Sequence, residues 1–167
     1  PKNVGQIPLF YNHKNTGRPL QNGKWFEKFR SNYLDVDNDA LYPFGYGLSY
    51  TTFQYGDIVL NTPTMKQNET ITATIQVTNS GKYDGAEVVQ LYIRDLVGSI
   101  TRPVRELKGF KKVFLKAGES KTISFKITAD LLRFYDYDLN QVTEPGEFDI
   151  FIGGSSQATK TARLTLK

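Results

Sequence analysis

Few side chains in this sequence of 167 residues could carry nucleophilic or metal chemistry. There is one histidine, His13, and no cysteine, so neither a zinc site nor a reactive thiolate is expected. Ser49 follows Gly47 by two positions, but Thr51 rather than Gly stands two positions after it. The G-x-S-x-G nucleophile motif of serine hydrolases is therefore not met, and these residues predict no nucleophilic catalysis.

Acidic residues come together in the stretch YLDVDNDA, which contains Asp35, Asp37 and Asp39. A calcium loop counted from Asp35 would need Gly at its sixth position and Glu at its twelfth, and the sequence has Ala40 and Tyr46 there. Acid–base catalysis by a pair of carboxylates needs one member in a dry pocket, whereas this stretch is rich in Asn and Asp. We therefore predict a solvated turn, with no metal and no cofactor.

A net charge of +4 and a pI near 9.2 raise the question of an anionic partner. Lysines concentrate in LKGFKKVFLKAGESKTISFK, but they alternate with apolar residues, as on the solvated face of a strand. We expect no nucleic acid partner. The alternative is a surface that anchors an anionic polymer, formed by Lys108, Lys111, Lys112, Lys116, Lys121 and Lys126.

Residues 53–167 alternate apolar and polar side chains at period two, which predicts strands with one buried face. Seven segments show the pattern, at 53–61, 70–79, 87–95, 106–115, 121–128, 146–154 and 162–167. Their predicted inner face consists of Ile71, Ala73, Ile75, Val77, Val89, Leu91, Ile93, Ile123, Phe125, Ile127, Phe148, Ile150 and Ile152. Residues 128–136 break the alternation, so we expect a helical turn and a short strand that cross between two sheets. About seven short strands predict an all-β sandwich of the immunoglobulin or fibronectin type III kind.

Residues 1–52 have a different character and predict an extended linker segment ahead of the sandwich at 53–167. Only the stretch VGQIPLFYN, residues 4–12, predicts a buried strand, and Gly, Pro, Asn and Asp recur through the rest. A loop of that length is uncommon inside a compact domain and normally has a function or links domains. No apolar run reaches the roughly 18 residues of a membrane-spanning helix, so no membrane span is expected.

The end of this linker, ALYPFGYGLSYTTFQY, concentrates aromatic rings in an irregular stretch. Large rings offer contact area at a low cost in rotamer entropy, and Pro and Gly fix a tight path for the chain. We therefore predict that this strip docks the linker onto the sandwich through its rings. The residues concerned are Tyr42, Phe44, Tyr46, Tyr50 and Phe53.

Four motifs carry a resemblance to a known family: GQIPLFYNHKNTGRP, YPFGYGLSYTTFQY, TRPVRELKGFKKVFLKAGES and EPGEFDIFIGGSS. Together they resemble the C-terminal end of bacterial glycoside hydrolase family 3 enzymes of the β-glucosidase type. In that family a barrel is followed by an α/β sandwich domain and then by a fibronectin type III-like domain. The resemblance implies that residues 1–12 are the last strand of the α/β sandwich domain, that 13–52 are a connector, and that 53–167 are the fibronectin-like domain.

The resemblance also implies what the parent protein does. Such enzymes hydrolyse β-linked glycosides with retention, in carbohydrate metabolism, using an aspartate nucleophile on the barrel and a carboxylate acid/base from the second domain. Neither catalytic motif is present, so no catalytic residue is assigned, and the chain alone is expected to be an inert structural module. Its expected partners are the parent's own barrel and α/β sandwich domains, in a periplasmic or secreted protein, with a homodimer of the parent left open.

Two interpretations of the linker's polar residues remain open. In an intact family 3 enzyme they could approach the rim of the substrate site, or they could bridge domains, with the arginines binding carboxylates. The residues are His13, Asn15, Arg18, Arg30, Tyr33 and Asp35.

A carbohydrate-binding or surface-adhesion module is the alternative function. It would require at least two exposed, roughly coplanar rings, drawn from Trp25, Tyr33, Tyr83, Tyr92, Tyr135 and Tyr137.

Overall fold

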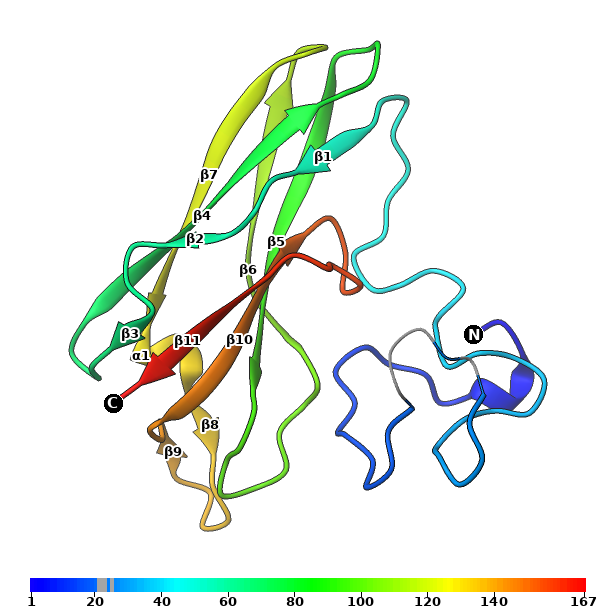
Figure 1. Cartoon of the computed structure of the whole chain (residues 1–167), viewed down its shortest axis with the longest axis vertical. Coiled ribbons are helices and arrows are strands. Elements are labelled where there is room, and N and C mark those ends of the chain that lie inside the picture. The colour runs from blue at the N-terminus through cyan, green and yellow to red at the C-terminus, as the bar shows by residue number, and fades with distance from the viewer. Residues whose placement is uncertain (21–23, 25) are drawn as a thin grey trace.

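The computed structural model describes residues 1–20, 24 and 26–167. It shows a β-sandwich with the N-terminal segment lying beside it (Figure 1). The alternation of apolar and polar residues at 70–79 and 120–128 places one side chain in two against the opposite sheet, and this burial holds the two layers together.

The first layer is a four-stranded antiparallel sheet built around one long central strand, β4. One edge of β4 pairs with β7, and the other edge pairs with β1 and then β2. The strands are β1 (Phe53–Tyr55), β2 (Val59–Leu60), β4 (Thr70–Asn79) and β7 (Ser120–Thr128).

The second layer is a five-stranded sheet in the order β3-β11-β10-β5-β6. The short β3 pairs with the last strand, β11, in parallel, and the other pairs are antiparallel. The strands are β3 (Thr64–Met65), β11 (Thr161–Leu166), β10 (Gly146–Gly153), β5 (Gly85–Asp95) and β6 (Glu106–Leu115).

A short crossover joins the layers after β7. Helix α1 (Ala129–Leu132) leads into β8 (Phe134–Tyr135), which pairs with β9 (Gln141–Val142) before the chain enters β10. This agrees with the helical turn and short strand predicted at 128–136.

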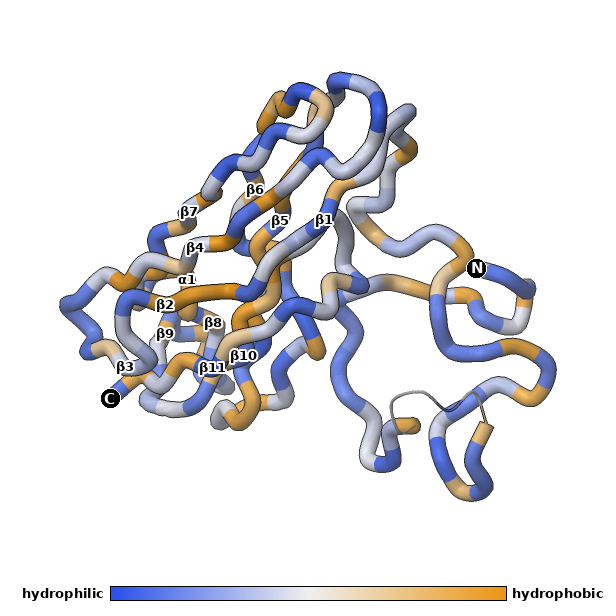
Figure 2. Tube along the Cα trace, turned by 45° about the horizontal axis from the view of Figure 1, so that its top comes forward, coloured by the Kyte–Doolittle hydropathy of each residue, from blue (hydrophilic) through white to orange (hydrophobic). Residues whose placement is uncertain are grey.

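The core lies between the two sheets and contains every residue of the predicted inner face. Leu115, Leu132, Leu164, Leu166 and Met65 complete it. Along the long strands the hydropathy alternates from residue to residue (Figure 2). The predicted β-sandwich is confirmed, although it has eleven strands in the described residues rather than about seven. The segment 53–61 divides into β1 and β2, and β3, β8 and β9 are additional two-residue strands.

The predicted buried strand at 4–12 is wrong for this structure. Residues Val4–Gln6 form a 3-10 turn, η1, capped by the side chain of Asn3. Its apolar side chains Val4, Ile7 and Phe10 are exposed, with Val4 at 82%. A strand needs a neighbour for its backbone hydrogen bonds, and the described residues offer none here.

Candidate functional site

The N-terminal segment is attached to the outer face of the five-stranded sheet, at β5 and β10. We call this attachment the seam, and its members are Tyr11 and Phe44 from the N-terminal segment and Gln90, Tyr92, Arg105 and Phe151 from the sandwich. Tyr92 lies opposite Phe151 in the sheet and is 0% exposed, although it faces away from the core. The ring of Tyr11 covers it edge-on, with 6.0 Å between ring centroids. This burial raises the pKa of Tyr92 to about 12, so its hydroxyl is a permanent donor.

Two parts of the N-terminal segment that are distant in sequence meet at the seam. The rings of Tyr11 and Phe44 stack with centroids 4.2 Å apart and an interplanar angle of 14°. The Tyr11 hydroxyl also accepts a hydrogen bond from the backbone N–H of Leu107 in β6. Two residues further along the chain, the carbonyl of His13 accepts a hydrogen bond from the backbone N–H of Val104 at 2.9 Å.

Gln90 joins the connector to the sandwich by hydrogen bonds. Its side-chain amide donates to the carbonyl of Gly45 at 3.0 Å and to the carbonyl of Gly154 at 2.8 Å. Its amide oxygen accepts from the hydroxyl of Tyr92. Gln90 is 4% exposed, so each of these bonds satisfies a group that would be costly to bury alone.

Gly45 permits this close approach. Its φ is +79°, a conformation that residues with a side chain rarely adopt. A Cβ at this position would lie 2.0 Å from the amide oxygen of Gln90. The YPFGYG motif therefore needs glycine at its fourth position for a steric reason.

Arg105, from the TRPVREL motif, closes the other side of the seam. Its guanidinium stacks on the ring of Phe151, 3.8 Å from the centroid, and donates to the carbonyls of Ser156 and Ala158. The N–H of Ser156 in turn donates to the carbonyl of Phe44 at 2.8 Å. Burial lowers the pKa of Arg105 from its ordinary value. Arg105 thus fixes the loop after β10, which holds the connector.

The rings of the aromatic strip do not dock the connector as predicted. Tyr42 and Tyr46 are exposed, and Tyr50 is 98% exposed. Phe44 stacks on Tyr11, and only Phe53, in β1, packs against the core. Backbone carbonyls of the connector supply the rest of the attachment, and a sequence of ring types does not reveal that.

The predicted rim residues are only partly brought together. His13 and Tyr33 line one open pocket of about 350 Å³ with apolar residues such as Phe10. Arg30 lies 3.7 Å from a carboxylate oxygen of Glu27.

Three further rim residues lie apart from this pocket's lining. Asp35 accepts a hydrogen bond from Asn3, the backbone carbonyl of Arg18 accepts from Ser31, and Asn15 is exposed. The six residues do not form one polar site.

The acidic stretch is held by residues at the start of the chain. Lys2 forms a 2.6 Å ion pair with Asp37, and this bond lowers the pKa of the Asp37 carboxyl. The side-chain amide of Gln6 donates to the carbonyls of Asp37 and Asp39. Within the described residues, no three His, Cys, Asp or Glu side chains gather in a way that could hold a metal ion.

The rings considered for sugar binding do not form a flat pair where the structure describes them. Tyr92 is buried, which corrects the expectation that it lies exposed, and Tyr33 is half-buried. Tyr83, Tyr135 and Tyr137 are exposed, whereas Trp25 lies outside the described residues. Another exposed pair, Tyr42 and Tyr46, is tilted by 37°.

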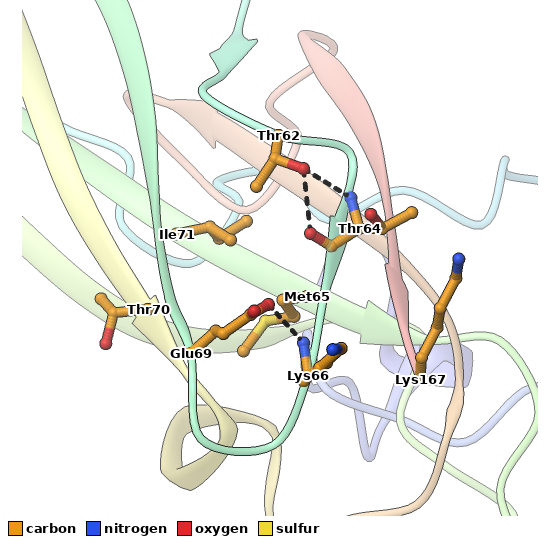
Figure 3. A pocket seen from close by; sticks show the side chains of 8 residues that line it. All are labelled: Thr62, Thr64, Met65, Lys66, Glu69, Thr70, Ile71 and Lys167. Carbon is orange, nitrogen blue, oxygen red and sulfur yellow. Dashed lines mark hydrogen bonds between the residues drawn. The ribbon is translucent and has the colours of Figure 1, made fainter.

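A second pocket lies at the far end of the sandwich, where the turn between β3 and β4 passes the C-terminus (Figure 3). It has a volume of about 430 Å³ and is open to solvent. Met65 and Ile71 form its apolar part, and Glu69 accepts a hydrogen bond from the backbone of Lys66. Each of these groups already has a structural role.

The lysines considered for polymer anchoring come from β6, from β7 and from the turn between them, and thus from both sheets. Lys108 and Lys121 pair with Glu106 and Glu119, and Lys111 lies over the ring of Phe125. Among the described residues these lysines therefore do not form one free basic face.

Comparison with known proteins shows what the chain resembles. The fibronectin type III-like domain family matches residues 87–156, the part of the chain that contains Gln90, Tyr92 and Arg105. The chain contains a fibronectin type III-like domain. This domain and its N-terminal segment are 48% identical to a periplasmic β-glucosidase of Salmonella typhimurium over 99% of the chain, and 44% identical to a β-xylosidase of Formosa agariphila over 100% of it.

Solved structures agree with the sequence relatives. A β-glucosidase from Listeria innocua in complex with glucose matches 97% of the chain with a TM-score of 0.89 and 40% identity. The chain spans 22% of the length of each of these three proteins. The resemblance of the fibronectin type III-like chain to the C-terminal region of family 3 β-glucosidases is thereby confirmed. No helix in residues 1–20, 24 and 26–167 is long and apolar enough to span a membrane.

Sequence reasoning missed the seam residues Tyr11, Gln90 and Arg105. A signal was present for one of them, because Gln90 interrupts the apolar run VVQLYI of β5. A polar residue buried inside such a run needs hydrogen-bond partners, and here the connector supplies one of them.

Proposed function

We propose that the chain is a non-catalytic C-terminal structural module of a family 3 glycoside hydrolase. The parent is a retaining β-glucosidase or a related exo-glycosidase that acts on β-linked glycosides in the periplasm or outside the cell. The observation that supports the proposal is the seam, where the side chains of Gln90 and Arg105 in the sandwich hold the connector and the loop that contacts it. A module that fixes a connector in place is suited to orienting neighbouring domains.

The exposed apolar side chains of the N-terminal segment support the same proposal. Val4, Ile7 and Phe10 are all more than half exposed. Exposed apolar side chains gathered in one segment are typical of a surface that another domain covers. We propose that residues 1–12 complete the α/β sandwich domain of the parent and that the exposed rings of 42–50 contact its catalytic domains.

The predicted rim residues fit domain bridging better than sugar contact. Arg18 is exposed and available for a carboxylate on a neighbouring domain. Arg30 already has one carboxylate close by, that of Glu27. We propose that these arginines, with His13, Asn15, Tyr33 and Asp35, lie between domains in the parent.

The proposal is tested by comparing the isolated chain with a full-length protein that carries it. The purified chain should not hydrolyse aryl β-glucosides or aryl β-xylosides, and it should show no retardation in gels containing soluble β-glucan. Deleting the module from the full-length enzyme should lower its melting temperature and its yield. Turnover by the isolated chain, or a deletion that leaves the full-length enzyme unchanged, would sink the proposal.

A further inference from the structure

The connector is fastened to the sandwich at two places that adjoin each other in space. Residues 11–13 form one attachment and residues 44–45 form the other, and the stack of Tyr11 on Phe44 joins them. We call residues 14–43 the arm, and its two ends are held side by side at β5, at the start of β6 and at the loop after β10. Whatever fixes this patch fixes both ends of the arm.

We propose that Gln90 is a hydrogen-bond latch for this arm. When the latch is closed, the connector lies on the outer face of the five-stranded sheet. When it opens, the arm detaches while the sandwich stays folded. The latch is a property of the chain itself and stands whether or not the proposed function is correct.

The position of Gln90 supports a latch rather than an ordinary buried contact. Its two amide hydrogens point to two carbonyls that belong to different segments, Gly45 of the connector and Gly154 after β10. Tyr92 donates to its remaining oxygen and thereby fixes the orientation of the amide. One side chain thus bonds the sheet, the connector and the loop after β10.

Around Gly45 the connector has little else to hold it. Its large apolar side chains near Gly45 are exposed, namely Leu41, Tyr42, Phe44, Tyr46, Leu48 and Tyr50. A segment with few buried apolar contacts opens locally at low free energy. At the seam, the connector is therefore held mainly by hydrogen bonds to its carbonyls, from Gln90, Ser156 and Val104, and by the stack of Phe44 on Tyr11.

The sharpest test is Gln90→Glu, which keeps the shape of the side chain and removes its donors. At neutral pH the carboxylate would face the carbonyl oxygens of Gly45 and Gly154, and both bonds would be lost. In acid the protonated carboxyl regains one O–H donor. The surrounding titratable groups are Tyr92, Tyr11 and Arg105 on the same face and Glu87 on the other face of β5, and all four are shared with the wild-type chain.

Hydrogen exchange reads out the latch at single amides. The N–H groups of Ser156 and Val104 donate to connector carbonyls, so their protection reports the closed state. We expect Gln90→Glu to lower that protection about tenfold or more near pH 7, relative to wild type at the same pH. Part of the loss should be recovered as the pH falls toward the ordinary glutamate pKa of about 4.3, and burial of the carboxyl moves this recovery to higher pH. Protection in β4 and β7 should stay unchanged.

Gln76→Glu is the matched control, because Gln76 is exposed on β4 in the other sheet. It should leave the Ser156 and Val104 amides as in wild type. Unchanged protection in Gln90→Glu overturns the latch. So does an equal loss in β4 and β7, or a failure of the variant to fold, because each would mean that Gln90 supports the sandwich rather than the connector.

Gly45→Ala opens the same latch from the connector side and leaves Gln90 intact. Its Cβ would collide with the amide of Gln90, whereas Gly118→Ala has the same backbone strain, at φ +77°, with no atom within 4 Å. We expect Gly45→Ala to expose the Ser156 amide and Gly118→Ala to leave it protected. Equal behaviour of the two alanine variants at Ser156 would contradict the proposal.

Discussion

The hydroxyl of Tyr55 donates a 2.9 Å hydrogen bond to a carboxylate oxygen of Glu87, and this bond joins the two sheets of the sandwich. Tyr55 lies in β1 and Glu87 in β5. Burial raises the pKa of both groups from their ordinary values. The tyrosine therefore remains a donor, and the glutamate binds its proton more tightly in the folded chain than in the unfolded chain.

This pair predicts that stability depends on pH. Because the pKa of Glu87 is raised on folding, its contribution is most favourable in acid, below the ordinary glutamate pKa of about 4.3. It weakens as the pH rises through the raised value. Glu87→Gln should therefore gain stability relative to wild type as the pH rises above the ordinary glutamate pKa of about 4.3 and through the raised value. Urea unfolding at a series of pH values checks this, and a constant difference would refute it.

Replacing Arg102, in the TRPVREL motif, should lower the free energy of unfolding by a large amount. Its guanidinium lies over the ring of Phe134, 2.8 Å from a Glu106 oxygen and 3.8 Å from an Asp95 oxygen. The Arg102 side chain is 11% exposed and that of Asp95 is 7% exposed. Arg102→Met leaves a buried carboxylate without its cation and should cost about 3 kcal/mol.

Arg163→Met is the control for that substitution. Arg163 pairs with Glu147 and Asp149, but its side chain is 50% exposed, so its loss should cost less than about 1 kcal/mol. Guanidinium unfolding of both variants measures the difference. Equal losses would mean that burial does not govern these ion pairs.

Asn79, at the end of the sandwich where two turns meet, is a second position where a substitution should lower stability. Its side-chain amide donates to the carbonyls of Tyr83 and Leu115, and its oxygen accepts from Thr51 and Gly81. Asn79→Asp keeps the acceptors and loses both donors at a fully buried site, so it should cost about 2 kcal/mol or more. Asn15→Asp, at an exposed position, should change the melting temperature very little.

Substitutions of two rings close in sequence, Tyr50 and Phe53, should differ in their effect on stability. Tyr50→Ser should leave the stability of the isolated chain within about 0.5 kcal/mol, because that ring is almost fully exposed. Phe53→Ser, three residues later, removes a ring that packs against the core and should cost about 2 kcal/mol. Thermal unfolding of the two variants compares them, and a large loss from Tyr50→Ser would restore the ring-docking hypothesis.

The sandwich could be predicted from sequence because its signal is local. Along 70–78 and 121–128 the apolar residues face the core and the polar residues between them are exposed or half-buried, so period two alone identifies the strands and their buried faces. The strand predicted at 4–12 rested on a short apolar stretch without regular alternation. It failed because a strand also requires a neighbour, and no local pattern contains that information.

The seam could not be predicted for a related reason. It depends on backbone carbonyls of Phe44 and Gly45 and on the distance between Tyr11 and Tyr92 across the fold. Ring types at 42–53 indicated that the strip matters, and its glycines indicated a tight path. Neither feature reveals that Tyr42, Tyr46 and Tyr50 are exposed and that main-chain carbonyls make much of the contact.

Residues 11–13 and 44–45 are attached to the sandwich side by side, and this has a consequence for how such modules can diversify. A loop that leaves and rejoins a scaffold at one point can change length at little thermodynamic cost, since doubling its length adds only about 0.6 kcal/mol. The stretch between the two attachments is thus an exchangeable cassette. Grafting a cassette from one relative into another should leave the scaffold beneath it undisturbed.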